Sequence, residues 1–175
     1  FGDGAGAAIV CREIDTSKGI LSSHLHSEGK HAEELSLIGP STNRWVPEII
    51  KANDPEDISY YPYMNGQFVF KNAVIRFEQV ILEGLKKNNL SPEDIDLLIP
   101  HQANLRISQF VQRKFGLKDD QVYNNIEKYG NTTAASIPIA LTEAWESGKI
   151  KSGDNIVLAA FGSGFTWGSV IINWQ

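Results

Sequence analysis

Apolar and turn-forming residues divide the start of the chain into two short stretches that are typical of strands. Residues 7–14 (AAIVCREI) follow a glycine cluster and contain several residues that favour strands. Residues 19–26 (GILSSHLH) alternate apolar and polar side chains, which is the period of a half-buried strand. We therefore predict a strand in each stretch.

A long polar segment then interrupts the pattern. Residues 27–63 contain prolines at positions 40, 47, 55 and 62. Segments of this length without a regular pattern are uncommon in compact domains and usually have a function. We expect a functional loop or lid here.

A helical period begins near Gln67. Five large apolar residues recur at helical spacing: Phe70, Val74, Phe77, Ile81 and Leu85. The pattern stops at residues 88 and 89, which are both asparagine. The sequence predicts a long helix that ends there.

Strands and helices alternate over the remaining chain. The predicted strands cover residues 95–100, 124–129, 155–160 and 168–173. The predicted helices cover residues 105–115 and 133–147, and Ser91 followed by Pro92 predicts a helix cap before the first of these strands. The last two strands are close enough to form a hairpin around residues 161–165. This alternation predicts one domain of the α/β class, covering residues 1–175.

Composition and charge narrow the class of protein. The chain has 175 residues, of which 42% are hydrophobic and 21% charged, with a net charge of −5. This is typical of a soluble globular protein with one substantial core, and the mild acidity argues against nucleic-acid or anionic-membrane binding. No apolar run approaches the ~20 residues that span a bilayer.

The only cysteine, Cys11, excludes an internal disulfide and suggests a reducing compartment, so we expect a cytoplasmic protein. Cys11 lies in a strand-like stretch and is expected to be an inert core residue. No signal peptide is visible. The chain starts at Phe1 with strand-like material, so we expect its natural N-terminus to be missing.

Three clusters of polar residues and glycine occur where strands end, which is where sites form in α/β sheets. They are PHQAN at residues 100–104, YGNTT at 129–133 and FGSGF at 161–165. Each allows two interpretations. His101 either donates a fixed N–H to a ligand or is a capping or core histidine satisfied by the backbone, and Asn131 either donates from its amide or caps a helix. The turn around Ser163 either aims backbone N–H groups at a ligand or only reverses the chain.

Taken together, the three clusters bring neutral donors to one region without an obvious acid. Such an arrangement suits an oxyanion or an enolate on a carbonyl. No nucleophile accompanies them, because Phe161 stands where the G-x-S-x-G elbow needs its first glycine. An acyl-transfer site cannot be completed from these residues alone.

Two other patterns do not indicate sites. Residues 2–7 (GDGAGA) loosely match a dinucleotide fingerprint, but no strand precedes them and no helix follows. His24, His26 and His31 lack a cysteine or carboxylate that would complete a metal site. We predict no metal and no cofactor.

The chain resembles the C-terminal half of β-ketoacyl-acyl-carrier-protein synthase III, the initiating condensing enzyme of type II fatty acid synthesis. The resemblance spans the whole chain except for a weaker match at residues 27–63. The matching stretches are FGDGAGAAIV (1–10), GILSSHLH (19–26), PYMNGQFVFKNAV (62–74), IPHQANLRI (99–107), YGNTTAASIPIAL (129–141) and FGSGFTWGSVIINW (161–174).

This resemblance implies a thiolase-like fold with two α/β halves in five αβαβα layers. The chain would supply the second half, with a mixed five-stranded sheet and helices on both faces. The first half, which is absent here, would carry the nucleophilic cysteine. The implied activity is decarboxylative Claisen condensation of an acyl-CoA primer with malonyl-ACP, and both thioesters are substrates.

The resemblance also implies roles for individual residues. His101 and Asn131 would polarise the malonyl thioester carbonyl, and the backbone N–H of Ser163 would contribute to an oxyanion hole, at a position where many relatives have glycine. Substrate-binding positions are Asn104, which lies near the pantetheine arm, and Gly66 and Phe70, which line the acyl tunnel. Carrier-protein docking positions are Arg106, Arg113 and Lys114, although the last two also suit a solvated helix face.

The implied partners are acyl carrier protein, acyl-CoA, the missing N-terminal half and a second copy in a homodimer. Neither nucleic acid nor a membrane is expected. Two alternatives stay open for the function. One is a related condensing enzyme of specialised metabolism, and the other is a non-catalytic partner subunit. On its own, the chain is expected to be inactive and to associate through exposed apolar surface.

Overall fold

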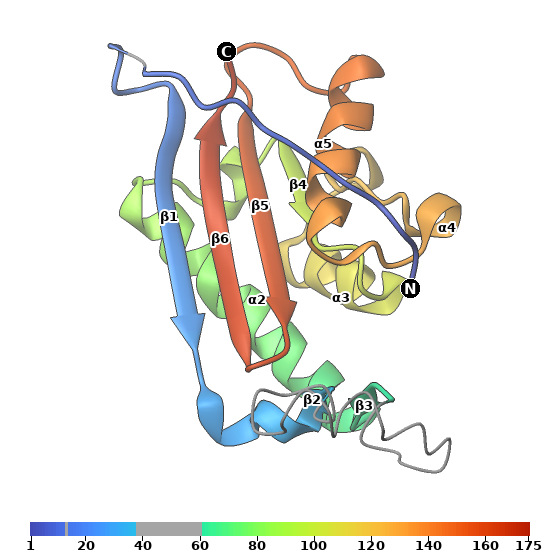
Figure 1. The fold of residues 1–175 in the computed structure, drawn as a ribbon. Coiled ribbons are helices and arrows are strands. Elements are labelled where there is room, and N and C mark those ends of the chain that lie inside the picture. The colour runs from blue at the N-terminus through green and yellow to red at the C-terminus, as the bar shows by residue number, and fades with distance from the viewer. Residues whose placement is uncertain (13, 38–60) are drawn as a thin grey trace.

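The computed structural model describes residues 1–12, 14–37 and 61–175, and Figure 1 shows its fold. The described chain forms a four-stranded sheet in the order β1-β6-β5-β4. Its strands are β1 (Gly19–Ser27), β4 (Leu97–Pro100), β5 (Asn155–Gly162) and β6 (Thr166–Asn173). The β1–β6 and β5–β6 pairs are antiparallel, whereas β4 and β5 are parallel. The sheet is therefore mixed, as predicted, but it has four strands and not five among the described residues.

The predicted strand at residues 7–14 is wrong for residues 7–12, which lie in no strand. A strand needs a neighbour that pairs with its backbone, and this segment has none in the described chain. It crosses in front of α5 instead (Figure 1). Glycines allow this close approach, because a Cβ atom on Gly2 would collide with the Tyr129 carbonyl oxygen and one on Gly6 with Pro138. Cys11 is therefore exposed, contrary to the expectation of a core residue.

The helices largely follow the prediction. They are α2 (Gly66–Lys87), α3 (Leu105–Phe115), the short α4 (Ile126–Tyr129) and α5 (Ser136–Glu146). Gly116 ends α3 with a left-handed φ of 67°, a conformation that glycine adopts without strain. The predicted strand at residues 124–129 is wrong, because α4 occupies it. The Gln102 side chain accepts hydrogen bonds from the N–H groups of Asn125 and Ile126, which favours a helical turn at this point.

Short elements connect the larger ones. They are the 3-10 turns η1 (Gly29–Glu34), η3 (Pro92–Asp94), η4 (Asp119–Gln121) and η5 (Thr133–Ala135), and the strands β2 (Leu35–Ser36) and β3 (Tyr63–Met64). The two short strands pair in an antiparallel ribbon. Most of the predicted loop or lid, residues 38–60, lies outside the described residues.

Helices pack on both faces of the sheet, as predicted. The larger apolar cluster joins α2 and α3 to one face through residues such as Phe77, Leu98 and Phe165. The smaller cluster joins α5 to the other face through Leu97 and Ile99 on β4, and Ile156 on β5. Strand β4 is thus buried on both sides, which explains its uninterrupted apolar sequence.

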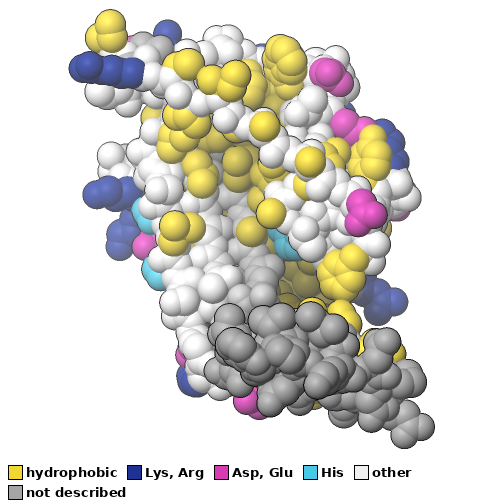
Figure 2. Space-filling view, viewed as in Figure 1, with side chains coloured by type: hydrophobic (Ala, Val, Ile, Leu, Met, Phe, Trp, Pro, Cys, Tyr) yellow, Lys and Arg dark blue, Asp and Glu magenta, His cyan; other side chains and the backbone are white. Residues whose placement is uncertain are grey.

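The second face is only partly covered. In Figure 1, α5 lies beside β4, and no helix crosses the front of β1 and β6. Figure 2 shows hydrophobic side chains on this open area. Leu25 on β1 faces this side, because its neighbours His24 and His26 contact Glu83 on α2, and it is 81% exposed. Such an area is typical of a surface that another molecule or domain covers.

Candidate active site

An open cavity of about 1540 Å³ lies at the end of the sheet where β4 and β5 terminate. Seven of the nine residues singled out in the sequence line it: His101, Asn131, Ser163, Asn104, Gly66, Phe70 and Arg106. They come from five places, namely the start of α2, the loop after β4, the start of α3, the loop before α5 and the β5–β6 hairpin. The fold therefore brings together the three polar clusters that the sequence separates by up to about sixty positions.

The other two residues, Arg113 and Lys114, lie further along α3 and do not line the cavity. Both are exposed. The Lys114 ammonium lies 3.3 Å from the Glu78 carboxylate on α2, so it already has a partner. Of the three basic residues, only Arg106 is at the edge of the cavity.

His101 is held on two sides. Its backbone N–H donates to the Ala159 carbonyl at 2.8 Å, which continues the β4–β5 pairing by one residue. Its ring Nδ1 lies 2.6 Å from the hydroxyl of Ser136, a residue that is 2% exposed. The same hydroxyl oxygen accepts the Gln102 N–H at 3.3 Å.

This arrangement favours one tautomer of the imidazole, because the Ser136 oxygen already accepts the Gln102 N–H and its proton is available to donate. Among the described residues, Nδ1 of His101 is the acceptor that lies within reach of the Ser136 hydroxyl proton. If Nδ1 accepts, Nε2 carries the ring proton and becomes a donor. Burial lowers the pKa of His101 below its usual value, so the ring is neutral at pH 7.

Asn131 is held by its oxygen. The Oδ1 atom accepts the backbone N–H of Thr133 at 2.9 Å, as in a helix-capping turn. The side-chain nitrogen donates to no described residue, and Asn131 lines the cavity. The two interpretations of Asn131 are therefore compatible, because one end of the amide caps and the other end can donate to a ligand.

The β5–β6 hairpin places Ser163 at the cavity. Phe165, which is fully buried, anchors the turn by exchanging backbone hydrogen bonds with Glu28. The Ser163 carbonyl accepts the Thr166 hydroxyl at 2.9 Å. The turn is thus fixed by the core on one side, while Ser163 stays exposed on the other.

The remaining cavity residues belong to helix starts. Asn104 caps α3, because its Oδ1 accepts the Arg106 N–H at 2.9 Å. Gly66 begins α2, and a Cβ atom there would meet nothing within 4 Å. Phe70 lies one turn further along α2 and is partly buried against the main core. Each position combines a structural role with a place on the cavity wall.

Two residues of the site were missed from the sequence. Ser136 is 35 positions away from the histidine that it holds, and no spacing rule connects them. Gln102 lies next to His101 and is 3% exposed. Its position between a buried strand and a helix could have identified it, since an amide that is buried there needs hydrogen-bond partners.

The three predicted non-ligand histidines have protein partners. His26 Nε2 lies 2.6 Å and His24 Nδ1 3.3 Å from the carboxylate of Glu83 on α2, and His31 packs on Phe68. Within the described ranges, no group of three or more His, Cys, Asp or Glu side chains could hold a metal ion. No described helix is long and apolar enough to cross a membrane.

Known proteins resemble this chain closely. The β-ketoacyl-[acyl-carrier-protein] synthase III of Clostridioides difficile is 46% identical over 175 residues, which are 99% of this chain and 51% of that protein. The enzyme of the same name from Caldanaerobacter subterraneus is 45% identical over all of this chain and 51% of its own length. The chain therefore spans about half the length of the curated relatives it matches.

Solved structures agree with this comparison. The β-ketoacyl-acyl-carrier-protein synthase III of Thermus thermophilus superposes with a TM-score of 0.81 at 38% identity, over 93% of this chain and 48% of that one. The Aquifex aeolicus 3-oxoacyl-acyl-carrier-protein synthase III gives 0.78 at 39% identity, over 93% and 46%. These matches confirm the predicted thiolase-like fold.

A family model described as 3-oxoacyl-[acyl-carrier-protein (ACP)] synthase III C terminal matches residues 85–174, about half of the chain. The chain therefore belongs to the C-terminal family of 3-oxoacyl-[acyl-carrier-protein] synthase III.

Proposed function

We propose that this chain supplies the histidine and asparagine of a β-ketoacyl-ACP synthase III, which condenses an acyl-CoA primer with malonyl-ACP to start fatty acid synthesis. One observation carries the proposal. His101 and Asn131 line the same cavity, and each is held from behind by the atom that does not donate. Ser136 engages Nδ1 of the histidine, and the Thr133 N–H engages Oδ1 of the asparagine, so two neutral N–H donors remain for a ligand.

Two such donors suit the malonyl half-reaction. They would donate to the thioester carbonyl oxygen of malonyl-ACP. As the C–C bond to the carboxylate breaks, carbon dioxide leaves and the electron pair forms an enolate, whose negative oxygen both donors stabilise. The α-carbon then attacks the acyl thioester on the cysteine of the other half, and the cysteine leaves as a thiolate.

The charge around the cavity fits this chemistry. No Asp or Glu is among the described residues that line it. A carboxylate there would repel both the malonyl carboxylate and the enolate. The lowered pKa of His101 keeps the ring neutral, so the histidine acts as a hydrogen-bond donor and not as a general acid.

The cavity walls fit an acylated pantetheine arm. Gly66 leaves open space, Phe70 adds an apolar wall, and Asn104 adds an amide. We place the backbone N–H of Ser163 in the thioester oxyanion hole, since a backbone donor does not depend on its side chain. Arg106 at the cavity edge, with Arg113 on the same helix, would meet the acidic carrier protein. Lys114 contributes less, because Glu78 already pairs with it.

The proposal implies further partners. The catalytic cysteine would come from an N-terminal half that packs on the open face of the sheet, giving five layers in all. The complete enzyme would work as a cytoplasmic homodimer, with no cofactor beyond its thioester substrates.

Substitution of the two donors in the full-length protein tests the function. His101→Ala or Asn131→Ala should lower malonyl decarboxylation by ~10²–10³-fold, the usual effect of removing one oxyanion donor. Acyl transfer from acyl-CoA to the cysteine should change much less, because that step uses the other half. His24→Ala serves as the matched control, since His24 pairs with Glu83 away from the cavity. Equal losses in both half-reactions would refute these roles.

A further inference from the structure

The segments that carry His101 and Asn131 are joined by hydrogen bonds through Gln102 and Glu143, neither of which lines the cavity. Gln102 begins this connection. Its amide nitrogen donates to the carbonyls of Pro100 at 2.7 Å and Tyr123 at 3.3 Å. Its oxygen accepts the backbone N–H groups of Asn125 at 3.0 Å and Ile126 at 3.2 Å. A glutamine amide has two donors and two acceptor positions, so all four are used and the side chain has one orientation.

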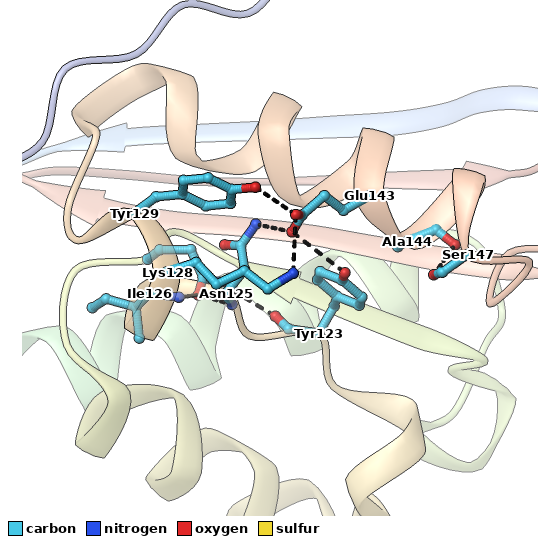
Figure 3. Close-up of polar contacts among 9 residues, drawn as sticks. Tyr123, Asn125, Ile126, Lys128, Tyr129, Glu143, Ala144 and Ser147 are labelled. Carbon is cyan, nitrogen blue, oxygen red and sulfur yellow. Dashed lines mark hydrogen bonds and ion pairs between the residues drawn. The ribbon is translucent and has the colours of Figure 1, made fainter.

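Glu143 on α5 holds the other end of the same segment, as Figure 3 shows. Its Oε1 accepts the Tyr129 hydroxyl at 2.6 Å and the Lys128 ammonium at 3.2 Å. Its Oε2 accepts the Asn125 amide at 2.8 Å and faces the Tyr123 hydroxyl at 3.5 Å. All four partners lie in the stretch that ends directly before Gly130 and Asn131.

Apart from a backbone hydrogen bond near each end, from the Tyr123 N–H to the Leu98 carbonyl at 2.9 Å and from the Gly2 N–H to the Asn131 carbonyl at 2.8 Å, this stretch has few other contacts to hold it. Helix α4 is four residues long and contains no buried residue. A helix of this length is not stable by itself, and here no apolar face compensates. The two side chains Gln102 and Glu143 meet at Asn125, which is 5% exposed and is bound by both of them. Hydrogen bonds therefore determine where the stretch lies.

Helix α5 connects this network to His101. Ser136, which engages the imidazole, and Glu143, which engages the stretch before Asn131, are seven positions apart. Seven positions are close to two helical turns, so both side chains project from the same face of α5. One rigid element thus holds both donors.

We propose that Glu143 is a positioning residue, which sets the place of Asn131 relative to His101 so that both donors reach one thioester carbonyl oxygen. The inference rests on the proposed function and deepens it. A carboxylate offers about four acceptor positions and matches the four donors, whereas a neutral amide offers two. Loss of two anchors would let the stretch shift, and a displacement near 1 Å can cost about 10²-fold in rate.

The experiment compares Glu143→Gln with Glu146→Gln in the full-length protein. Glu146 lies on the same helix but is exposed, so its substitution makes the same chemical change without touching the network. Glu143→Gln should lower kcat for malonyl decarboxylation by about 10- to 100-fold, with a smaller change in KM. Acyl transfer to the cysteine should not change. Amide hydrogen exchange should become faster in residues 125–131 alone, and Glu146→Gln should match the unchanged protein throughout.

A second variant keeps the test decisive if Glu143→Gln fails to fold. Tyr129→Phe removes only the hydroxyl that donates to Glu143 and keeps the ring. It should lower decarboxylation by less than Glu143→Gln while leaving acyl transfer intact. An unchanged decarboxylation rate in these variants, or equal losses in both half-reactions, would overturn the inference.

His101→Ala separates this outcome from failure of the proposed function. If His101→Ala abolishes decarboxylation and the Glu143 and Tyr129 variants do not affect it, positioning by Glu143 is refuted and the function stands. If His101→Ala also leaves decarboxylation unchanged, the proposed function is refuted, and the role inferred for Glu143 is refuted with it.

Discussion

The two sides of the sheet are held by different forces. On the α2 side, large apolar residues fill the space, and Phe77, Ile81 and Phe165 are at most 1% exposed. On the α5 side, the apolar cluster is smaller, and the loops around it are positioned by the hydrogen bonds that they form with Ser136 and Glu143. Apolar contacts have no preferred direction, whereas hydrogen bonds fix angles as well as distances. Stability should therefore depend mainly on the α2 side, and the geometry of the site on the α5 side.

Part of the α5 side is not covered by any helix of the described chain. Beyond α5, the sheet face over β1 and β6 exposes apolar side chains (Figure 2). Leu25 on β1 is 81% exposed, and Ile9 in the N-terminal segment is 93% exposed, although both are large and apolar. Because the chain spans about half the length of its relatives, we propose that the missing half packs on this area.

The largest expected effect comes from the α2 side. Phe77→Ala should lower the free energy of unfolding of this chain by about 3–5 kcal/mol, since it removes buried contacts and leaves a cavity. Urea denaturation measures the change. Phe110→Ala is the control, because Phe110 is 37% exposed on α3. Similar losses in the two variants would contradict a core concentrated between α2 and the sheet.

The sequence predicted the elements whose signals are local. The helix at residues 105–115 matches α3 at both ends, since Asn104 caps its start and Gly116 its end. The last two strands and their hairpin are also confirmed. The two wrong strand predictions have a different explanation, because the structure of both segments depends on residues that are distant in the sequence. Residues 7–12 have no neighbouring strand in the described chain, and residues 125–126 are turned into a helix by Gln102.

The candidate site shows the same difference between local sequence signals and distant partners. His101 and Asn131 stand out because polar side chains follow a buried strand or precede a helix, and the fold places both on one cavity. Their supports, Ser136 and Glu143, are ordinary helix residues in the sequence. Only the packing of α5 against β4 brings them to their partners, so sequence reasoning could not assign them.

A smaller effect with a defined pH dependence is expected on the α5 side. Hydrogen bonds from Tyr129 and Asn125, together with Lys128, lower the pKa of Glu143 from 4.5 to about 2. A lowered carboxyl pKa stabilises the fold above the unfolded pKa, and this stabilisation is lost as the pH falls through the folded pKa. Glu143→Gln should therefore reduce stability by roughly 1–2 kcal/mol at pH 7, after allowance for solvent screening.

The difference between Glu143→Gln and the unchanged chain should shrink as the pH falls from about 4.5 to about 2. The Lys128 ammonium and the tyrosine hydroxyls stay protonated over this range, so Glu143 is the member of the cluster that titrates. Urea midpoints at several pH values measure the effect, with Glu146→Gln as the control. A difference that stays constant down to pH 2 would show that the charge of Glu143 does not stabilise the cluster.

A substitution on the open face should have the smallest effect on stability. It should instead alter the self-association of the chain. Leu25→Ser should change the free energy of unfolding by no more than about 0.5 kcal/mol, because Leu25 is already exposed. It should weaken self-association of the chain, since an exposed apolar area favours contact with another surface. Light scattering over a range of concentrations measures this, and Leu82→Ser, at a 43% exposed leucine on α2, is the matched control. If the unchanged chain is a monodisperse monomer, or if both leucine variants weaken association equally, the open face is not the surface through which this chain associates.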